Sequence, residues 1–138
     1  MRPCYVLDAC ALIAFLNDEA GADVVEDLLR AAGAQQAILI LHRINLLEVY
    51  YGVYRHEGHE AGTHVLEKVR DLPVAEVDQI TEAVFMEAGR LKALYRLSLA
   101  DSIAAAEAMV RSARLVTADH HEFDPIEPRG EFSLYWIR

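Results

Sequence analysis

The chain has 138 residues, a length suited to one compact domain and too short for two, so we expect residues 1–138 to form a single domain. Hydrophobic residues make up 54% of the chain and charged residues 25%, with only 7 glycines and 4 prolines, which excludes a disordered, collagenous or low-complexity protein. The net charge of −9, taken alone, argues against a nucleic-acid partner or an anionic membrane surface.

The longest uninterrupted apolar run covers residues 9–16 and is far shorter than the ~20 residues of a membrane-spanning helix. Asp8 would also interrupt the apolar part of a secretory signal. We therefore expect a cytoplasmic protein with no membrane segment.

Short apolar runs alternate with helical patterns along the chain. The predicted strands cover residues 4–7, 37–41, 73–77, 115–117 and 132–137. The predicted helices cover residues 9–16, 20–32, 44–54, 65–72, 80–95 and 101–113, with glycines 33, 58 and 62 marking breaks. This alternation indicates an α/β fold with a mainly parallel sheet that helices cover on both faces.

Three aspartates stand where apolar segments end. Asp8 and Asp119 follow short strands, and Asp101 opens a predicted helix. In open parallel sheets ligands bind in the crevice at the carboxyl ends of the strands, so Asp8 and Asp119 are predicted to point into it. Taken singly, each aspartate is better explained as a helix N-cap, which contributes about 1 kcal/mol.

Glu48 lies inside the apolar helical segment 44–51, where a buried carboxylate is costly unless it is paired or binds a metal. A partner such as Arg43 or Arg55, or an exposed stripe of the helix, is the alternative. Clustered carboxylates repel one another by about 4 kcal/mol per pair at ~4 Å and an effective dielectric of ~20, so a cluster of the four acids requires a cation. Oxygen ligands favour Mg²⁺ or Mn²⁺ over zinc, and phosphodiester hydrolysis is the reaction class that such an ion serves.

Four stretches carry a family resemblance. They read VLDACALIA at 6–14, NLLEVYYG at 45–52, SLADSIAAA at 98–106, and LVTAD at 115–119 with Phe123. With these stretches in this order, the sequence resembles a PIN-domain ribonuclease, and more narrowly the VapC-like toxin of a type II, VapBC toxin–antitoxin pair. One stretch alone would be a weak signal, whereas four in order over residues 6–123 are specific.

The resemblance implies a three-layer α/β/α sandwich with a mainly parallel sheet of four to five strands. It implies an endoribonuclease that cuts RNA by metal-activated water, with Mg²⁺ or Mn²⁺ as cofactor. The implied catalytic and metal-binding residues are Asp8, Glu48, Asp101 and Asp119. Of these, Asp8 and Asp101 are expected as direct ligands, Glu48 as a ligand or water-orienting base, and Asp119 as a ligand to a second or weaker metal. The hydroxyl of Thr117 is expected to position the end of the last of these strands.

The same resemblance implies a cognate VapB-like antitoxin as partner, whose Arg or Lys enters the acidic pocket. It also favours a homodimer formed through the apolar helices that carry Tyr50, Tyr51 and Tyr54. Two departures from the family pattern stand out. Cys10 replaces a common Ser or Thr, which leaves only a weak thiol donor. The segment from Asp119 to Phe123 is one residue longer than the commonest form, which we expect to affect a loop more than the metal.

The negative net charge conceals a basic stretch. From residue 89 to residue 114 five basic residues stand against two acidic ones, and Arg90, Lys92 and Arg96 are candidates to bind RNA. The competing interpretation of these three is a solvated helix end, where cations are favourable.

Two alternatives to the metal-dependent nuclease stay open. In the first, the chain is a catalytically weak or inactive PIN-fold module that binds RNA or a partner protein. In the second, His120 and His121 cleave RNA by metal-independent acid–base catalysis. A P-loop NTPase is excluded, because no glycine-rich loop follows Asp8.

Overall fold

The computed structural model describes all of residues 1–138. Five strands, seven α-helices and one 3₁₀ helix follow one another along the chain. In order they are β1 (Cys4–Leu7), α1 (Ala9–Leu16), α2 (Ala22–Gly33), β2 (Ile38–His42), α3 (Arg43–Glu57), α4 (His59–Arg70), β3 (Ala75–Val77), α5 (Glu82–Leu94), α6 (Leu99–Val110), β4 (Arg114–Thr117), α7 (His120–Phe123), the 3₁₀ helix (Glu127–Arg129) and β5 (Ser133–Trp136).

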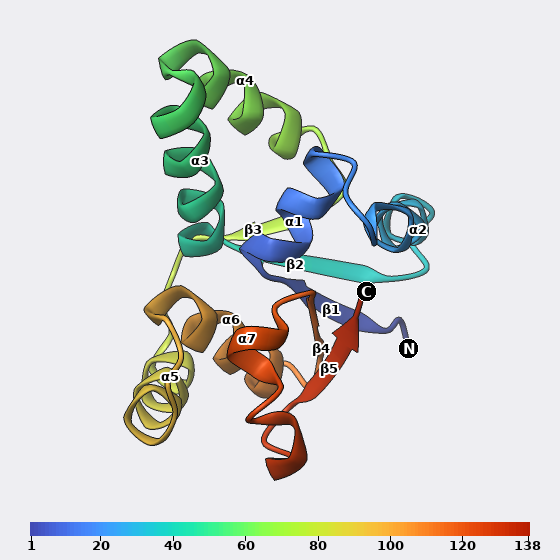
Figure 1. The fold of residues 1–138 in the computed structure, drawn as a ribbon. Helices are drawn as coiled ribbons and strands as arrows, with labels where there is room; N and C mark the ends of the chain where they lie inside the picture. The colour runs from blue at the N-terminus through green and yellow to red at the C-terminus, as the bar shows by residue number, and fades with distance from the viewer.

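The strands form one sheet in the order β3-β2-β1-β4-β5, and every neighbouring pair is parallel. Helices cover both faces, with α1 and α2 on one side and α5, α6 and α7 on the other (Figure 1). The expected α/β fold, a three-layer sandwich around a parallel sheet, is therefore confirmed. Of the expected four to five strands, the sheet has five.

Side-chain alternation along β1 explains the two layers. Val6 and Leu7 are both fully buried, yet they belong to different core clusters because successive strand residues point to opposite faces. Leu7 packs in the cluster that includes Leu12 and Val25, whereas Val6 packs with Ala104 and Ala105 of α6. A continuous apolar strand is thus required here, since both of its faces are covered.

The polar residue before a helix decides where it begins. Thr81 and Ser98 cap α5 and α6, and the hydroxyl of Ser98 accepts a hydrogen bond from the main-chain N–H of Asp101 at 3.1 Å. The expectation that Asp101 opens a helix is therefore wrong. It is the third residue of α6, and its carboxylate is free for another role.

Two glycines expected to interrupt the α3–α4 region behave differently. Gly58, with φ of 94°, separates the two helices, because this left-handed conformation suits glycine. Gly62 instead lies within α4, and the ring of Tyr50 packs so closely that a Cβ on Gly62 would lie 3.0 Å from it. Gly62 therefore does not interrupt a helix as expected, and its missing side chain instead makes room for the ring of Tyr50.

The segment after β4 is more regular than expected. Instead of a loop, residues 120–123 form the one-turn helix α7, and the fully buried Phe123 anchors it in the core beneath α6. None of the helices combines the length and the apolarity that a membrane span requires.

Candidate metal centre

The topology brings two of the predicted acids together. The chain runs from β1 outward to β2 and β3 and then returns across β1 to form β4, so the order of the strands reverses between β1 and β4. Asp8 directly follows β1, and its main-chain N–H donates to the carbonyl of Val116 in β4 at 3.2 Å. Asp119 lies two residues beyond β4. Both acids therefore stand at the point where open α/β sheets bind ligands. Helices α3, α6 and α7 gather around this edge (Figure 1).

Helix capping uses only one of the two carboxylate oxygens of Asp8. Its Oδ1 accepts a hydrogen bond from the main-chain N–H of Ala11 at 2.8 Å, which caps α1. Its Oδ2 is buried and has no hydrogen-bond partner. Burial raises the pKa of Asp8 to about 7, and the charges of Asp119 and Glu48 add to the rise, while Thr117 and the Ala11 amide oppose it. This buried oxygen, which has no partner within the protein, is available to bind a cation.

Asp101 reaches the same place from α6. It is 8% exposed, and burial raises its pKa to about 8, with further contributions from the charges of Asp8, Asp119 and Glu122. The Ser98 hydroxyl caps the helix and works against the rise. Because Ser98 supplies the cap, capping does not explain Asp101.

A fifth acid, Glu122, completes the cluster, and sequence reasoning did not identify it. One carboxylate oxygen each from Asp101, Asp119 and Glu122 lie within 4.8 Å of one another, an arrangement that could hold a metal ion. The Asp119 carboxylate also accepts from the main-chain N–H of Glu122 at 3.1 Å, so the α7 turn places both acids on one side. The three-residue spacing from Asp119 was the available signal, because residues i and i+3 of a helix share a face.

Glu48 faces the cluster from α3. It is partly buried, and its pKa is raised by burial and then by the charges of Glu122 and Asp119. Neither arginine considered as its partner pairs with it: Arg43 pairs with Glu76, and Arg55 lies over the ring of Tyr51. The alternative of a neutralising arginine for Glu48 is therefore excluded.

No basic side chain neutralises any of the five acids, because all ion pairs of the molecule involve other carboxylates. Mutual repulsion in a partly buried site makes such a cluster unfavourable without a cation. A hard divalent ion with oxygen ligands, such as Mg²⁺ or Mn²⁺, fits this donor set.

Thr117 and Cys10 lie close to the acids in the sequence. Thr117 is fully buried, and its hydroxyl accepts from the main-chain N–H of Asp119 at 3.0 Å, which orients the turn that follows β4. Burial, reinforced by the charge of Asp8, raises the pKa of the Cys10 thiol to about 11. Cys10 therefore stays protonated and offers a thiol where the family commonly has a hydroxyl.

The contacts of His120 argue against a free catalytic imidazole. Its ring stacks on Trp136 at 3.9 Å between centroids, Nδ1 bonds to Asp124 at 2.8 Å, and Nε2 bonds to the carbonyl of Arg138 at 2.9 Å. These bonds raise its pKa. Because both ring nitrogens are engaged, His120 is a structural residue in this fold.

The three basic candidates for RNA binding differ in their surroundings. Arg90 pairs with Glu87 and Glu131, both at 3.0 Å, and the Lys92 ammonium donates to the carbonyl of Leu97 at 2.6 Å. Arg96 is exposed and makes no ion pair, and it lines a cleft that also includes Glu122. Of the three, only Arg96 is both unpaired and next to the acids.

Comparison with known proteins gives a family and a fold. The family model described as PIN domain matches residues 5–126. VapBC2 of Rickettsia felis, solved with a DNA fragment from its promoter, has a TM-score of 0.76 at 19% identity, covering 96% of this chain and 98% of that chain. DNA-bound VapBC of Salmonella typhimurium has a TM-score of 0.72 at 19% identity, covering 100% of both chains.

Mycobacterium tuberculosis VapC20, a toxin that cleaves the sarcin–ricin loop, has a TM-score of 0.63 at 14% identity, covering 93% of this chain and 95% of that chain. At these identities the structural similarity establishes a shared fold. The comparison with curated protein sequences gave no match.

Proposed function

The chain belongs to the PIN-domain family, and from this premise we propose that it is a Mg²⁺- or Mn²⁺-dependent endoribonuclease, the toxin of a VapBC-type pair. In this proposal residues 1–138 act as one PIN domain, in the cytoplasm, where cellular RNA is accessible. The observation that carries the proposal is the cluster of five acids without a counter-cation at the β1–β4 reversal. The structural similarity to VapBC complexes and to a toxin that cleaves the sarcin–ricin loop supports it.

We assign the metal ligands to Asp8, Asp101, Asp119 and Glu122. The unpartnered Oδ2 of Asp8 and the converging oxygens of the other three supply the oxygen donors that such an ion prefers. When bound, the ion would polarise the phosphodiester and promote ionisation of the attacking water. Glu48, on the facing helix and with a raised pKa, is suited to orient that water and accept its proton. Thr117 holds the Asp119 turn in place.

The test is cleavage of a single-stranded RNA by purified protein with Mn²⁺, with EDTA, and with the Asp8→Asn variant. Asparagine keeps the α1 cap, so the variant should stay folded while losing its metal and its activity. The matched control is Asp27→Asn on the exposed face of α2, which should leave the rate unchanged. Full activity in EDTA would contradict the proposal and favour His121 or another metal-independent route. RNA binding with no cleavage under any condition would assign the chain to the non-enzymatic module.

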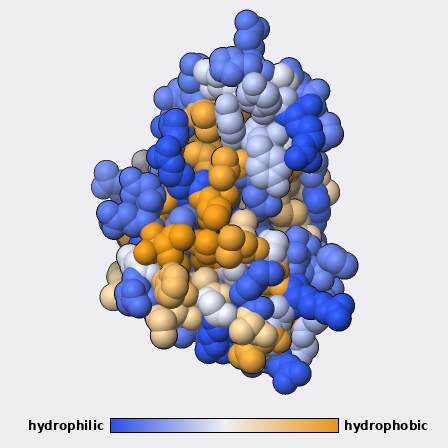
Figure 2. Space-filling view, turned by 90° about the vertical axis from the view of Figure 1, so that its left-hand side faces the viewer, coloured by the Kyte–Doolittle hydropathy of each residue, from blue (hydrophilic) through white to orange (hydrophobic).

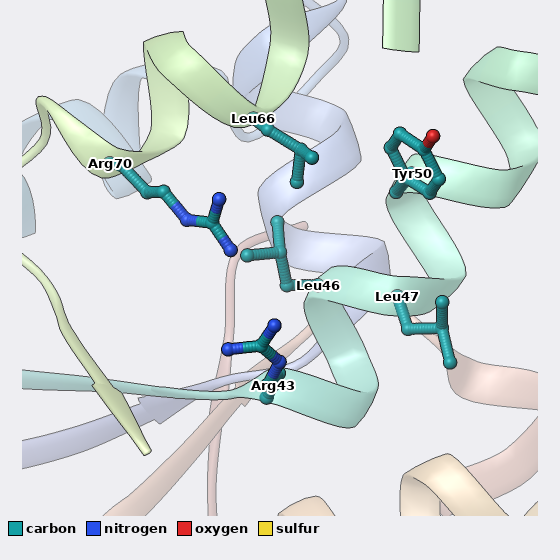
Figure 3. Close-up of a pocket in the computed structure, with 6 residues that line it drawn as sticks. All are labelled: Arg43, Leu46, Leu47, Tyr50, Leu66 and Arg70. Atoms are coloured by element: carbon teal, nitrogen blue, oxygen red, sulfur yellow. The ribbon is translucent and has the colours of Figure 1, made fainter. Parts of the chain in front are cut away.

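We further propose that a VapB-like antitoxin inhibits this site by inserting an Arg or Lys into the acidic cluster. Its apolar residues would pack in a cleft of about 210 Å³ between α3 and α4. In that cleft the side chains of Arg43 and Arg70 point toward each other (Figure 3). Glu76 forms an ion pair with each of these two arginines. The cleft residues are Arg43, Leu46, Leu47, Tyr50, Leu66 and Arg70. Copurification with the product of a neighbouring reading frame tests the pairing, and an inserted segment without a basic residue would contradict the charge argument.

We also propose a homodimer. Apolar side chains gather on one face of the molecule (Figure 2). Leu47 of α3, Ile80 just before α5, Phe85 of α5 and Leu99 of α6 are each about half exposed or more. Several of these residues line an apolar pocket of about 290 Å³ between α3, α5 and α6, and Tyr51 adds to the exposed apolar surface of α3. A second copy would remove this surface from water. Sedimentation of the wild type as a monomer at micromolar concentration would contradict the dimer.

A further inference from the structure

A cleft adjoins the acidic cluster on the side of α7. It has a volume of about 460 Å³ and lies between the end of α5 and the segment that contains α7 and the 3₁₀ helix. Glu122 belongs to both places, since it lines the cleft and converges with Asp101 and Asp119. A chain that enters the acidic cluster can therefore continue directly into this cleft.

Two arginines line the cleft with their charges unpaired. Arg96 and Arg129 are exposed, and neither makes an ion pair or a side-chain hydrogen bond within the protein. The acid that could compete for Arg129 is already engaged, because Glu131 accepts hydrogen bonds from Arg90 at 3.0 Å and from the Tyr95 hydroxyl at 2.7 Å. Because Glu131 is already engaged, the guanidinium group of Arg129 is available to an external anion. The unpaired guanidinium group of Arg96 is available as well.

Besides the two arginines, His121 and Glu122, the cleft is lined by apolar and aromatic side chains. Tyr95 lines it, and the hydrogen bond to Glu131 restrains the tyrosine side chain at the cleft wall. Pro125 and Ile126 lie on the wall as well, and Ile126 is almost fully buried. Unpaired arginines beside an aromatic wall are the combination that binds single-stranded nucleic acid, with phosphates on the cations and bases against the rings.

We propose that this cleft, the Arg96–Arg129 cleft, binds the nucleotide adjacent to the scissile phosphate of a single-stranded RNA. Arg96 and Arg129 contact its phosphate, and Tyr95 contacts its base. This inference rests on the proposed nuclease function and specifies where the substrate strand runs. The shared residue Glu122 favours RNA over an acidic protein segment, because a polynucleotide holding one phosphate at the metal ligands presents its next phosphate nearby.

The experiment measures RNA binding separately from cleavage. Arg96→Ala, Arg129→Ala and the double variant are made in the Asp8→Asn background, and fluorescence anisotropy gives the Kd of a labelled ten-nucleotide single-stranded RNA at several salt concentrations. Each single variant should weaken binding on the order of tenfold, because it removes charge-assisted hydrogen bonds. The slope of log K against log salt should fall by about 0.7 for each lost phosphate contact.

The matched control is Arg2→Ala. Arg2 is exposed and precedes β1, so it lies near the amino-terminal ends of the strands, whereas the acids lie near their carboxyl ends. Loss of the Arg2 side chain should change neither the Kd nor the salt dependence of binding. Melting curves confirm that the exposed substitutions leave the fold intact. A double variant with the same Kd for RNA as its Asp8→Asn parent would overturn the cleft proposal. The proposal would also fail if Arg2→Ala weakened RNA binding as much as the double variant does.

Cleavage by otherwise wild-type protein separates this proposal from the proposed function. With Mn²⁺, the arginine variants should raise KM with little change in kcat, because they remove substrate binding away from the reacting atoms. If the wild type cleaves and the arginine variants have an unchanged KM, the cleft proposal fails and the nuclease stands. If the wild type binds RNA through these arginines without cleaving it, the nuclease fails and the cleft proposal is supported.

Discussion

Helix α6 carries two buried acids in opposite electrostatic surroundings. Glu107 is 2% exposed, and one of its oxygens accepts a hydrogen bond from Arg111 at 3.0 Å, while His42 lies 3.7 Å from the other. Asp101, at the start of the same helix, is 8% exposed and has acids and no arginine around it. The sequence offers two acids in one apolar helix, and the fold neutralises only one of them.

This difference teaches that burial alone does not identify a functional acid. Glu107 joins α6 to Arg111 and to the end of β2, so its charge serves the packing of the fold. Asp101 keeps a raised pKa because it is buried and because the charges around it are those of other acids. We propose an external cation as the partner of Asp101, and experiments can separate the two acids by activity, metal response and stability.

The largest expected difference is in catalysis. Asp101→Asn should lower RNA cleavage with Mn²⁺ by about a thousandfold, since a metal ligand contributes several kcal/mol to transition-state stabilisation. Glu107→Gln should stay within a few-fold of the wild type after correction for its folded fraction. Initial rates on a fluorogenic RNA measure both. Comparable losses in the two variants would remove the distinction between the acids.

Metal addition should distinguish them next, independently of activity. Mn²⁺ at about one hundred times its Kd should stabilise the wild type by about 2.7 kcal/mol, because it binds only the folded cluster. Glu107→Gln should show the same upward shift of Tm on metal addition, whereas Asp101→Asn should show little or none. Thermal melts with Mn²⁺ and with EDTA provide the measurement. An equal shift in Asp101→Asn would place the ion elsewhere.

The contribution of Arg111 to neutralising Glu107 can be measured by removing the arginine. Arg111→Ala leaves Glu107 buried without its cation, so the free energy of unfolding should fall by about 2 kcal/mol. The matched control is Arg30→Ala, because Arg30 makes the same type of pair with Glu26 on an exposed helix face and should cost less than about 0.5 kcal/mol. Urea denaturation measures both, and equal losses would mean that burial of Glu107 has no energetic consequence.

The smallest expected effect is the pH dependence of the metal-free protein. Because the pKa values of Asp8 and Asp101 are raised to about 7 and about 8, the folded state binds more protons than the unfolded state above about pH 4. Stability should therefore be greatest near pH 4 and decline as pH rises toward 8. Asp8→Asn should be more stable than the wild type at pH 8, and the difference should shrink toward pH 4, where the wild-type carboxyl is protonated in the folded state. Melting temperatures in EDTA across this range test the sign.

The strands and two of the acids were predictable for a local reason. A parallel strand buried on both faces must be an apolar run, and the polar residue after such a run stands at the ligand-binding edge, which located Asp8 and Asp119. Glu122 escaped prediction, because its three-residue spacing from Asp119 is a single local signal in a helix of only four residues. That helix exists where Asp119 caps it and Phe123 enters the core.

Competing local signals explain the other differences. Ser98 and Asp101 are both good N-caps, and the burial of Leu97 and Ala100 favours the earlier start of α6. Arg90 and Arg96 look equivalent in the sequence, yet Arg90 meets Glu131, 41 residues away, and Arg96 meets no acid. Both outcomes depend on tertiary packing, which buries Leu97 and Ala100 and brings Glu131 to Arg90.

By itself, the sequence determined the α/β class, the parallel sheet, and the positions of Asp8 and Asp119 after strands, because these follow from hydrophobic periodicity and from residue types at strand ends. The full set of four acids was implied by the resemblance to PIN domains. The tertiary structure alone decided which charges remain without a partner. It paired Glu107 with Arg111 and Arg90 with Glu131, and it left Asp8, Asp101 and Arg96 unpaired. The physical reason is that charge compensation depends on distances between segments far apart in the chain, and those distances exist only after the layers have packed.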